Sequence, residues 1–556
     1  MSILRCEYPR PDFQRAAETF FPLNGQWEFG YGRDGDFTKE ITVPFVPESE
    51  LSGIGEVCDE KYVRYRRTFT LPESFEKGRV ILHIGACDYE TYVRINGVSA
   101  GVHAGGYTPM EFDITKLLTE GENTVTVTAF DDTASPLQPS GKQAADFPHG
   151  CFYTKCTGIW QSVWLENVPD TYIRSVKILP DVKGEKADFT VELSRDSSVC
   201  AEISFAGEKV GCGRGNGKTV KFSVPVLSPH LWDIGEGNLY DVRLDCGDDS
   251  VYTYFGMRSV ECDGRKLLLN GKPLFMRLLL DQGYYPDGIY TPADAAVFAK
   301  DIDRCMAAGF NGVRMHMKVF EPGYVYEADK KGFLLWGEFP NWGLDISDSR
   351  ANDIFLPQWT EAVLRDVNHP SIIGWCPFNE AFPGDNTAIM KAVFEKTKRI
   401  DPTRPVIDTS GYIHVIEGDI YDVHDYTQNP KELFSHYSDF ENAPYKNPFD
   451  YNAGYNGKTP FFVSEFGGAF YDIDAIHENS AQESGNPWGY GQAPANEDEF
   501  IARLSALCSV LRDNPGICGF CYTQFTDVMQ EMNGIFSYDR RAKFNLDRVK
   551  KAVTGE

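Results

Sequence analysis

The sequence lacks the long apolar segments that a membrane span or an export signal requires. No stretch of its 556 residues approaches eighteen consecutive apolar positions, so we expect no transmembrane helix and no membrane partner. Residues 1–7 contain no apolar core of signal-peptide length. These two absences predict a cytoplasmic protein.

Cysteines in paired spacing are also scarce. The 14 cysteines include one Cys-x-x-Cys pair, Cys518 and Cys521, inside an apolar run that is typical of a strand. Residues three apart on a strand point to opposite faces, so these two thiols cannot bind one metal ion together. We predict buried free thiols in a reducing compartment rather than a zinc or redox site.

Basic residues are too few for a nucleic-acid-binding protein. The chain has 54 Lys and Arg against 81 Asp and Glu, a formal net charge of −27. Such a chain repels phosphate backbones, and a polyanionic substrate is disfavoured for the same reason unless a local basic pocket overrides the global field. Aromatic residues, in contrast, make up 13% of the chain, and their rings suit sugar faces as well as protein cores.

The first half of the chain has the pattern of two β-domains. Residues 1–168 contain short alternating strands between turn signals, including the hairpin turn Asn96-Gly97, and predict a β-sandwich. Residues 169–262 continue with short strands and predict an immunoglobulin-like β-sandwich. In this second domain we expect the glycine-rich stretch 211–217 to be a break between strands.

From residue 263 to residue 556 apolar strands alternate with amphipathic helices, in the size and rhythm of a (β/α)₈ TIM barrel. Eight strands are predicted, near residues 274–280, 312–316, 333–338, 371–380, 406–408, 421–424, 461–463 and 517–522. Helices are predicted near residues 293–308, 321–331, 355–368, 386–400, 497–513 and 544–552. A doubly wound open sheet is the alternative, but no Gly-x-Gly-x-x-Gly follows the first strand.

Polar side chains gather where these strands end. In a barrel such positions share one rim, and they include two glutamates about eighty residues apart, Glu380 and Glu465. Hydrolysis of a glycoside needs such a pair of carboxyl groups, one to protonate the leaving oxygen and one below the sugar. The other strand-end candidates are Asp281, Gln282, Arg314, His316, Glu338, Asn379, His424, Tyr426, Gln524 and Asp527.

The two glutamates need different surroundings. As a nucleophile, Glu465 would use Arg314 and Tyr426 to lower its pKa. As the acid/base, Glu380 would need an apolar wall, which we expect from Trp375, Phe378 and Phe382. Since successive strand residues point to opposite faces, Asn379 and Glu380 can both face a substrate only if the strand ends or bulges there.

Several of these residues have a second interpretation. His316 and His424 could bind sugar or pack in the core, or they could be metal ligands together with Asp281 and Glu338. No His-x-x-x-His or similar spacing supports the metal, so we predict no metal ion. Trp342 and Trp488 are equally well explained as packing residues and as sugar platforms.

The chain also resembles glycoside hydrolase family 2 along nearly its whole length. The barrel motifs that carry the resemblance include Leu269-Asn-Gly-Lys-Pro273, Gly309-Phe-Asn-Gly-Val-Arg314 and Asp329-Lys-Lys-Gly-Phe-Leu-Leu-Trp336. Earlier motifs are similar to the family's jelly-roll sugar-binding domain and to its immunoglobulin-like domain: Leu23-Asn-Gly-Gln-Trp27, Tyr92-Val-Arg-Ile-Asn-Gly97, Thr157-Gly-Ile-Trp-Gln-Ser-Val-Trp164 and Phe255-Gly-Met-Arg258.

The resemblance implies a retaining double displacement without an organic cofactor. It implies that Glu380 is the acid/base, that Glu465 is the nucleophile in contact with Tyr426, and that Asn379 binds the second hydroxyl of the sugar. The full set of substrate-binding residues that we expect is Asp281, Arg314, His316, Glu338, Trp342, Asn379, His424, Tyr426, Trp488 and Gln524.

The chain departs from the family where substrate is recognised. β-Glucuronidases of the family carry Asn-x-Lys before a Gly-Ile-Phe stretch, and the lysine holds the uronate. Here Glu531-Met-Asn533 precedes Gly534-Ile-Phe536, and the added carboxylate would repel a uronate. The Arg-His-Glu run of the large metal-dependent β-galactosidases is also missing, since Leu280-Asp-Gln-Gly-Tyr284 follows the first strand.

We therefore expect a small neutral glycoside, in the manner of a β-galactosidase. An α-L-arabinofuranoside or another pentose or furanoside is the alternative, and a β-glucuronide is less favoured. A non-catalytic carbohydrate-binding relative is the alternative class, although such a protein usually loses one glutamate. A homo-oligomer is left open.

Overall fold

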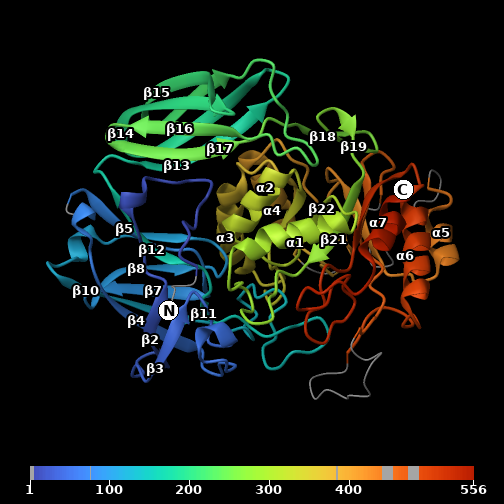
Figure 1. The fold of residues 1–556 in the computed structure, drawn as a ribbon, viewed down its shortest axis with the longest axis horizontal. Helices are drawn as coiled ribbons and strands as arrows, with labels where there is room; N and C mark the ends of the chain where they lie inside the picture. The colour runs from blue at the N-terminus through green and yellow to red at the C-terminus, as the bar shows by residue number, and fades with distance from the viewer. Residues whose placement is uncertain (1–4, 76, 383–385, 441–454, 474–486) are drawn as a thin grey trace.

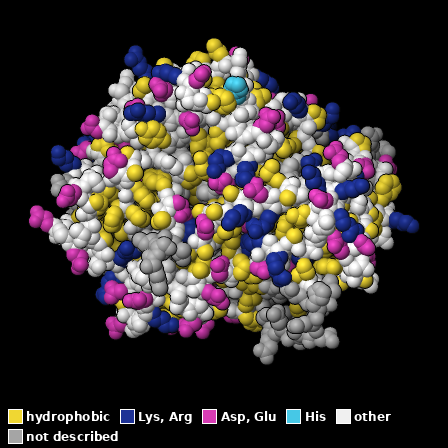
Figure 2. Space-filling view, viewed as in Figure 1, with side chains coloured by type: hydrophobic (Ala, Val, Ile, Leu, Met, Phe, Trp, Pro, Cys, Tyr) yellow, Lys and Arg dark blue, Asp and Glu magenta, His cyan; other side chains and the backbone are white. Residues whose placement is uncertain are grey.

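The computed structural model describes residues 5–75, 77–382, 386–440, 455–473 and 487–556. Three regions follow one another along the chain (Figure 1): a blue β-domain, a green β-domain and a yellow-to-red region of mixed strands and helices. In this described part of the chain, no helix is both long enough and apolar enough to cross a membrane. On the face drawn in Figure 2, the described Lys and Arg side chains are interspersed with Asp and Glu.

The first domain is a sandwich of two antiparallel sheets. One sheet has the order β1-β12-β5-β9 and the other β3-β2-β4-β10-β7-β8, and a small pair joins β11 to β6. Side chains from both sheets, such as Leu82 on β5 and Val93 on β7, share one buried core. The strands are β1 (Phe20–Pro22), β2 (Gly25–Tyr31), β3 (Lys39–Val43), β4 (Tyr62–Thr70), β5 (Arg79–Ile84), β6 (Cys87–Asp88), β7 (Glu90–Ile95), β8 (Val98–Ala104), β9 (Met110–Asp113), β10 (Glu122–Phe130), β11 (Gly158–Ile159) and β12 (Val163–Val168).

The second domain is built on one long bent hairpin. Its strands are β13 (Ile173–Asp181), β14 (Lys186–Phe205), β15 (Glu208–Pro225), β16 (Tyr240–Cys246) and β17 (Asp249–Phe255). The expected break at residues 211–217 is wrong, because these glycines lie inside β15 and pair with β14. An added Cβ at Gly213 would meet the side chains of Phe222 and Val224 at 2.7 Å, so the missing side chain lets the hairpin fold closely over itself.

The third region is a curled, all-parallel sheet with helices outside it, as the barrel pattern predicts. The strand order is β24-β23-β22-β21-β27-β26-β25. The bounds are β21 (Met276–Asp281), β22 (Gly312–Met315), β23 (Leu334–Glu338), β24 (Ile372–Cys376), β25 (Tyr421–Asp425), β26 (Phe461–Phe466) and β27 (Ile517–Tyr522). A small sheet of β18 (Val260–Asp263), β19 (Lys266–Leu269) and β20 (Lys272–Pro273) precedes it.

The eighth predicted strand, near 406–408, is not a regular strand in the structure. Its residues follow the edge of β24 through single bridges, Trp375 to Val406 and Asn379 to Ser410. The helices are α1 (Ala296–Ala307), α2 (Pro322–Lys331), α3 (Ala351–Asp366), α4 (Thr387–Ile400), α5 (Pro430–Tyr437), α6 (Glu497–Arg512) and α7 (Leu546–Thr554). The sequence pattern did not indicate α5, a short helix that starts with Asn429 as its N-cap and Pro430 as its first residue.

A long connection ties the jelly-roll domain to the barrel. Between β10 and β11 the chain leaves the first domain and runs to the barrel mouth (Figure 1). There the backbone N–H of Ser140 donates to the carbonyl of Trp342 over 2.8 Å. The hydroxyl of Tyr153 donates to Glu531 over 2.5 Å. This connection, residues 131–157, is called the jelly-roll loop below.

Candidate active site

Glu465 lies on β26, next to a bulge that turns its side chain inward. The register between β25 and β26 shifts so that Val423 pairs with Val463 and the next residue, His424, pairs with Glu465. Ser464 is the extra residue, and such bulges re-aim the side chains that follow them. Glu465 is 5% exposed.

Two donors hold the carboxylate of Glu465, as the sequence led us to expect. The guanidinium of Arg314 donates to Oε1 over 2.9 Å, and the hydroxyl of Tyr426 donates to Oε2 over 2.5 Å. The ring of Tyr426 is stacked on Tyr490 with 3.6 Å between centroids. The nucleophile candidate is therefore fixed at both oxygens by charge-assisted hydrogen bonds.

Glu380 follows the end of β24, where the backbone changes direction. The strand ends at Cys376, and Glu380 has a φ of 50°, in the left-handed region. The N–H of Glu380 donates to the carbonyl of Ser410 over 2.8 Å, and that of Asn379 donates to Oδ1 of Asn341 over 2.9 Å. Because the strand ends before these residues, Asn379 and Glu380 can both point into the barrel mouth. The alternation of side chains along a strand required such a strand end or a bulge at this position.

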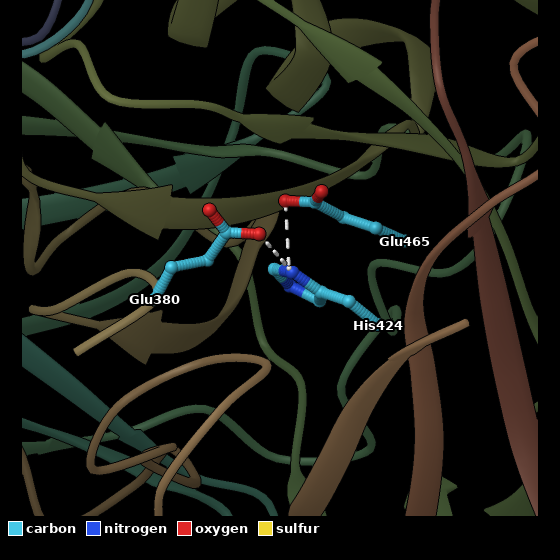
Figure 3. A group of neighbouring side chains, drawn as sticks. All are labelled: Glu380, His424 and Glu465. Carbon is cyan, nitrogen blue, oxygen red and sulfur yellow. Dashed lines mark hydrogen bonds and ion pairs between the residues drawn. The ribbon is translucent and has the colours of Figure 1, made fainter. Parts of the chain in front are cut away.

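His424 contacts both glutamates. Figure 3 shows its imidazole on one side of the carboxyl groups of Glu380 and Glu465, with a dashed line to each. Nδ1 lies 2.7 Å from Oε1 of Glu380, and Nε2 lies 3.3 Å from Oε1 of Glu465. One ligand atom from each of the three residues lies within 4.8 Å of the other two. The two carboxyl groups thus face one another, and one imidazole contacts both.

The expected apolar wall around Glu380 is wrong. Phe382 is 55% exposed, and the rings of Trp375 and Phe378 pack in the barrel core. Burial raises the pKa of Glu380, but its hydrogen bond to His424 and the charges of His424, Lys142 and Arg314 together outweigh burial, so the net pKa lies below the ordinary value. For His424 burial lowers the pKa, whereas the charge of Glu465 and the hydrogen bond to Glu380 raise it, and the net pKa lies above the ordinary value.

Arg314 is a positioning group at the floor of the site. It is 1% exposed, and besides Glu465 it donates to Oδ1 of Asn379 over 2.7 Å and to Glu338. His316 lies on the other oxygen of Glu338, with its Nδ1 at 3.0 Å. Burial and then the charge of Lys142 keep the pKa of His316 well below its usual range, so this imidazole is neutral.

The four metal ligands considered from sequence do not form one metal-binding group. Among the described residues, the group that could hold an ion is Glu380, His424 and Glu465, and it includes neither Asp281 nor Glu338. A divalent cation there would face the guanidinium of Arg314, which already lies against Glu465. This donor set does not fit a resident metal ion.

A buried polar network forms one wall of the site. The amide of Gln282 donates to Gln524, that of Gln524 donates to Asn533, and that of Asn533 donates to Glu531, over 3.0, 2.8 and 3.0 Å. Glu531 also accepts the hydroxyl of Tyr153 from the jelly-roll loop. Burial raises the pKa of Glu531, although Lys142 lowers it in part.

The remaining predicted residues lie at different distances from this centre. The indole N–H of Trp342 donates to the carbonyl of Asn379 over 3.1 Å, so Trp342 borders the site. Trp488 donates to the carbonyl of Gly150 over 2.6 Å and holds the jelly-roll loop. Asp281 is outside the network, since its carboxylate accepts from the N–H of Gly283 and faces Tyr324 on α2.

Lys142 is the residue that sequence reasoning missed. It reaches the barrel mouth from the jelly-roll loop, with its ammonium nitrogen 3.8 Å from the ring centroid of Trp342. Its neighbours Ser140 and Gly141 both donate to the carbonyl of Trp342. No strand pattern or motif marks this loop, and its partner in the barrel lies about two hundred residues later in the chain.

Comparison with known families agrees with this architecture. Residues 54–169 match the glycosyl hydrolases family 2 sugar binding domain, residues 171–258 match glycosyl hydrolases family 2, and residues 306–481 match its TIM barrel domain. The chain belongs to glycosyl hydrolase family 2. This family 2 chain is thus a glycoside hydrolase, with the jelly-roll, immunoglobulin-like and TIM-barrel order that the sequence predicted.

Its relatives within the family carry different names. A β-glucuronidase of Paenibacillus borealis is 24% identical over 439 residues, which cover 69% of this chain and 72% of that protein. A β-galactosidase of Thermoanaerobacter pseudethanolicus is 27% identical over 409 residues, 69% of this chain and 53% of that protein. The structure of Bifidobacterium dentium β-glucuronidase complexed with coumarin-3-O-glucuronide shares the fold, with a TM-score of 0.80, 19% identity, and coverage of 99% of this chain and 98% of that one.

Proposed function

We propose that this family 2 chain is a retaining exo-glycosidase that removes a neutral sugar, in the manner of a β-galactosidase, by double displacement through Glu465 and Glu380. The observation that carries the proposal is the separation of the two glutamates, whose nearest carboxylate oxygens lie within 4.8 Å of one another. Retaining enzymes hold their carboxyl groups about 5–5.5 Å apart, whereas inverting enzymes need about 6.5–9.5 Å to admit a water molecule.

The two carboxyl groups have distinct roles in this proposal. Glu465, aimed by Arg314 and Tyr426, attacks the anomeric carbon and forms a glycosyl ester. Glu380 gives a proton to the leaving oxygen and then accepts one from the water that cleaves the ester. Because Glu380 and His424 are bonded over 2.7 Å, this proton belongs to the pair rather than to the glutamate alone.

Asn379 supports the proposed sugar contact. Among the described residues, its side-chain N–H₂ is buried and has no hydrogen-bond partner, while its Oδ1 is fixed by Arg314. Leaving a buried donor unpaired costs free energy. A sugar hydroxyl, which we assign to the second carbon, would satisfy this donor when substrate binds.

Glu531 supports a neutral sugar. It is 2% exposed, burial raises its pKa, and the charge of Glu465 raises that pKa further. A uronate carboxylate in the same space would add a third negative charge. A uronide is the second candidate, because the relatives described above include proteins named β-glucuronidase.

The test is hydrolysis of nitrophenyl glycosides covering galactoside, glucoside, glucuronide, xyloside, mannoside and arabinofuranoside. We expect cleavage of a neutral glycoside, retention of anomeric configuration by NMR, and no turnover by Glu465→Gln. A product of inverted configuration would contradict the double displacement. Preferred cleavage of the glucuronide would contradict the neutral sugar, and sugar binding by an inactive wild type would support the non-catalytic alternative.

A further inference from the structure

A row of aromatic rings runs from the catalytic glutamates toward solvent. Trp342 lies 5.4 Å from Phe152 between ring centroids, Phe152 lies 5.5 Å from His149, and His149 lies 5.5 Å from Phe147. We call these four side chains the aromatic row. At its inner end Trp342 is bonded to Asn379, the residue before Glu380. At its outer end Phe147 is 68% exposed.

The loop that carries the row is fixed to the barrel. The carbonyl of Gly150 accepts from Trp488 over 2.6 Å and from Gln530 over 2.8 Å. Gln530 also donates to the carbonyl of Phe152 over 2.9 Å. Rings held in place while exposed to water are a feature of binding surfaces, and flat apolar rings suit the faces of sugars and aromatic groups.

Lys142 adds a positive charge at the inner end of the row. The side chain is 7% exposed, and among the described residues no carboxylate lies within ion-pair distance of its ammonium. Burial lowers the pKa of Lys142, but the charges of Cys151, Glu380, Glu531 and Glu465 together raise it above the usual value, so the group is charged. A charged ammonium that has no direct ion-pair partner can donate charge-assisted hydrogen bonds to a bound anion.

The pocket has a buried end at Glu531 and an exposed end at Phe147, and this difference decides which part of a substrate contacts the aromatic row. The wall of Glu531 and Gln524 is closed, with 2% and 0% exposure, whereas the row ends in solvent at Phe147. An exo-glycosidase places its terminal sugar at the closed end of the pocket, so the leaving group extends toward the open end. Trp342 is bonded to Asn379, the residue before the acid/base, and Lys142 lies over the ring of Trp342, so both are near the bond to the leaving group.

We propose that the aromatic row and Lys142 form the leaving-group subsite, and that this subsite takes a ring bearing a carboxylate. The ring stacks on the row and the carboxylate binds the ammonium of Lys142. An acidic sugar unit and a phenolic acid share this chemistry. The inference rests on the proposed glycosidase function and adds to it the chemical class of the leaving group.

Paired substrates test the charge directly. Starting from the sugar that the wild type cleaves best, one pair joins it to 4-hydroxybenzoate or 4-hydroxybenzamide, and a second pair joins it to glucuronic acid or glucose. For each pair the ratio of kcat/KM, acid over neutral, is measured in the wild type, Lys142→Met and Lys142→Arg. The comparison between proteins cancels the intrinsic reactivity of each leaving group.

We expect Lys142→Met to lower the ratio about tenfold, the order expected for loss of one charge-assisted hydrogen bond, and Lys142→Arg to keep most of it. The pair that shows the larger effect identifies the source of the acid. Equal ratios in the wild type and Lys142→Met would overturn the proposal. A second variant, Phe147→Ala with His149→Ala, should raise KM for both members of a pair without lowering the midpoint of thermal unfolding, because both side chains are exposed.

Failure of the proposed function gives a different result. If the wild type cleaves no glycoside, the double displacement fails, and the subsite is tested by calorimetric binding of free 4-hydroxybenzoate and of glucuronate. Binding of either acid that is lost in Lys142→Met and kept in Lys142→Arg would support the subsite on its own. The same affinity in all three proteins, or no binding, would overturn it.

Discussion

Oε1 of Glu380 and Nδ1 of His424 lie 2.7 Å apart, so the proposed acid/base shares its proton with a second buried group. The pKa of Glu380 is lowered and that of His424 is raised, and in the free enzyme the proton is therefore held on the imidazole. The pair must pass this proton to the leaving oxygen when substrate binds. Its ionisation, rather than that of an isolated glutamate, sets the pH at which the enzyme loses its acid.

Replacement of His424 should move the basic limb of the pH profile. In the wild type this limb marks loss of the shared proton from a pair whose histidine has a raised pKa. In His424→Asn the proton is lost from Glu380 alone. Burial raises the pKa of this carboxyl group, but it does so from the ordinary carboxyl range. We expect the basic limb of kcat/KM to shift to lower pH.

The matched control is His369→Asn, which removes another buried histidine bonded to a carboxylate, Asp329, over 2.6 Å, before the start of β24. Its basic limb should stay in place. A limb that does not move in His424→Asn, or that moves equally in both variants, would rule out the shared proton.

Tyr426→Phe should lower kcat about 10- to 100-fold, the effect expected from losing one hydrogen bond to a charged group. The hydroxyl that is removed lies 2.5 Å from Oε2 of Glu465. Burst kinetics with a nitrophenyl glycoside would assign the loss to formation or hydrolysis of the glycosyl ester. Tyr240→Phe, a similar change in the second domain, should leave kcat unchanged, and an equal loss there would point to a general effect on folding.

Glu531→Gln should relax the discrimination against uronides. The substitution removes one buried negative charge next to Glu465 and keeps the shape that Tyr153 and Asn533 bind. We expect the ratio of kcat/KM for glucuronide over galactoside to rise by at least about tenfold, which corresponds to about 1.4 kcal/mol of lost repulsion. An unchanged ratio would show that Glu531 does not exclude the uronate.

The ion pairs of Glu166 should make the free energy of unfolding decrease at acid pH. Its carboxylate lies 2.8 Å from Arg10 and 2.9 Å from Arg15, and Arg15 also lies 2.8 Å from Asp249 in the second domain. Burial raises the pKa of Glu166, but Arg10 and His83 hold the net pKa well below its usual range. The contribution to stability is therefore complete above the ordinary carboxyl pKa of about 4.3 and is lost as pH falls toward the folded-state value.

Glu166→Gln should lower the free energy of unfolding at pH 7 by about 3 kcal/mol, because it leaves buried cations without their partner. The difference from the wild type should shrink as the pH is lowered below about 4. Thermal unfolding midpoints at pH 7 and at acid pH check both statements. Glu28→Gln, which breaks an exposed pair with Arg66, should shift the midpoint far less, and equal shifts would contradict the argument.

The barrel and its two glutamates were predictable because their signals are local. Apolar runs of strand length end at Glu380 and Glu465, and strand ends in a barrel share one rim. The position of His424 against both glutamates was not predictable, since it depends on a one-residue register shift at Ser464. The glycines of β15 were predicted to break the strand for a related reason. Glycine has a low strand propensity, but here it is required because the side chains of Phe222 and Val224 pack closely over the strand.

Lys142 could not be found from sequence by the same logic. Its position depends on a loop with no periodic pattern and on contacts with residues in another domain. The acidic composition pointed away from anions, whereas the local field at the barrel mouth depends on where a single ammonium is buried.

The contact between Tyr153 and Glu531 joins residues 378 positions apart. A ribosome therefore makes one side of the pocket wall long before the other, and Glu465, the proposed nucleophile, comes more than three hundred residues after the jelly-roll loop. No nascent chain that stops short of the last barrel strand holds a complete pocket. A chain that ends before residue 531 therefore lacks one side of the proposed pocket.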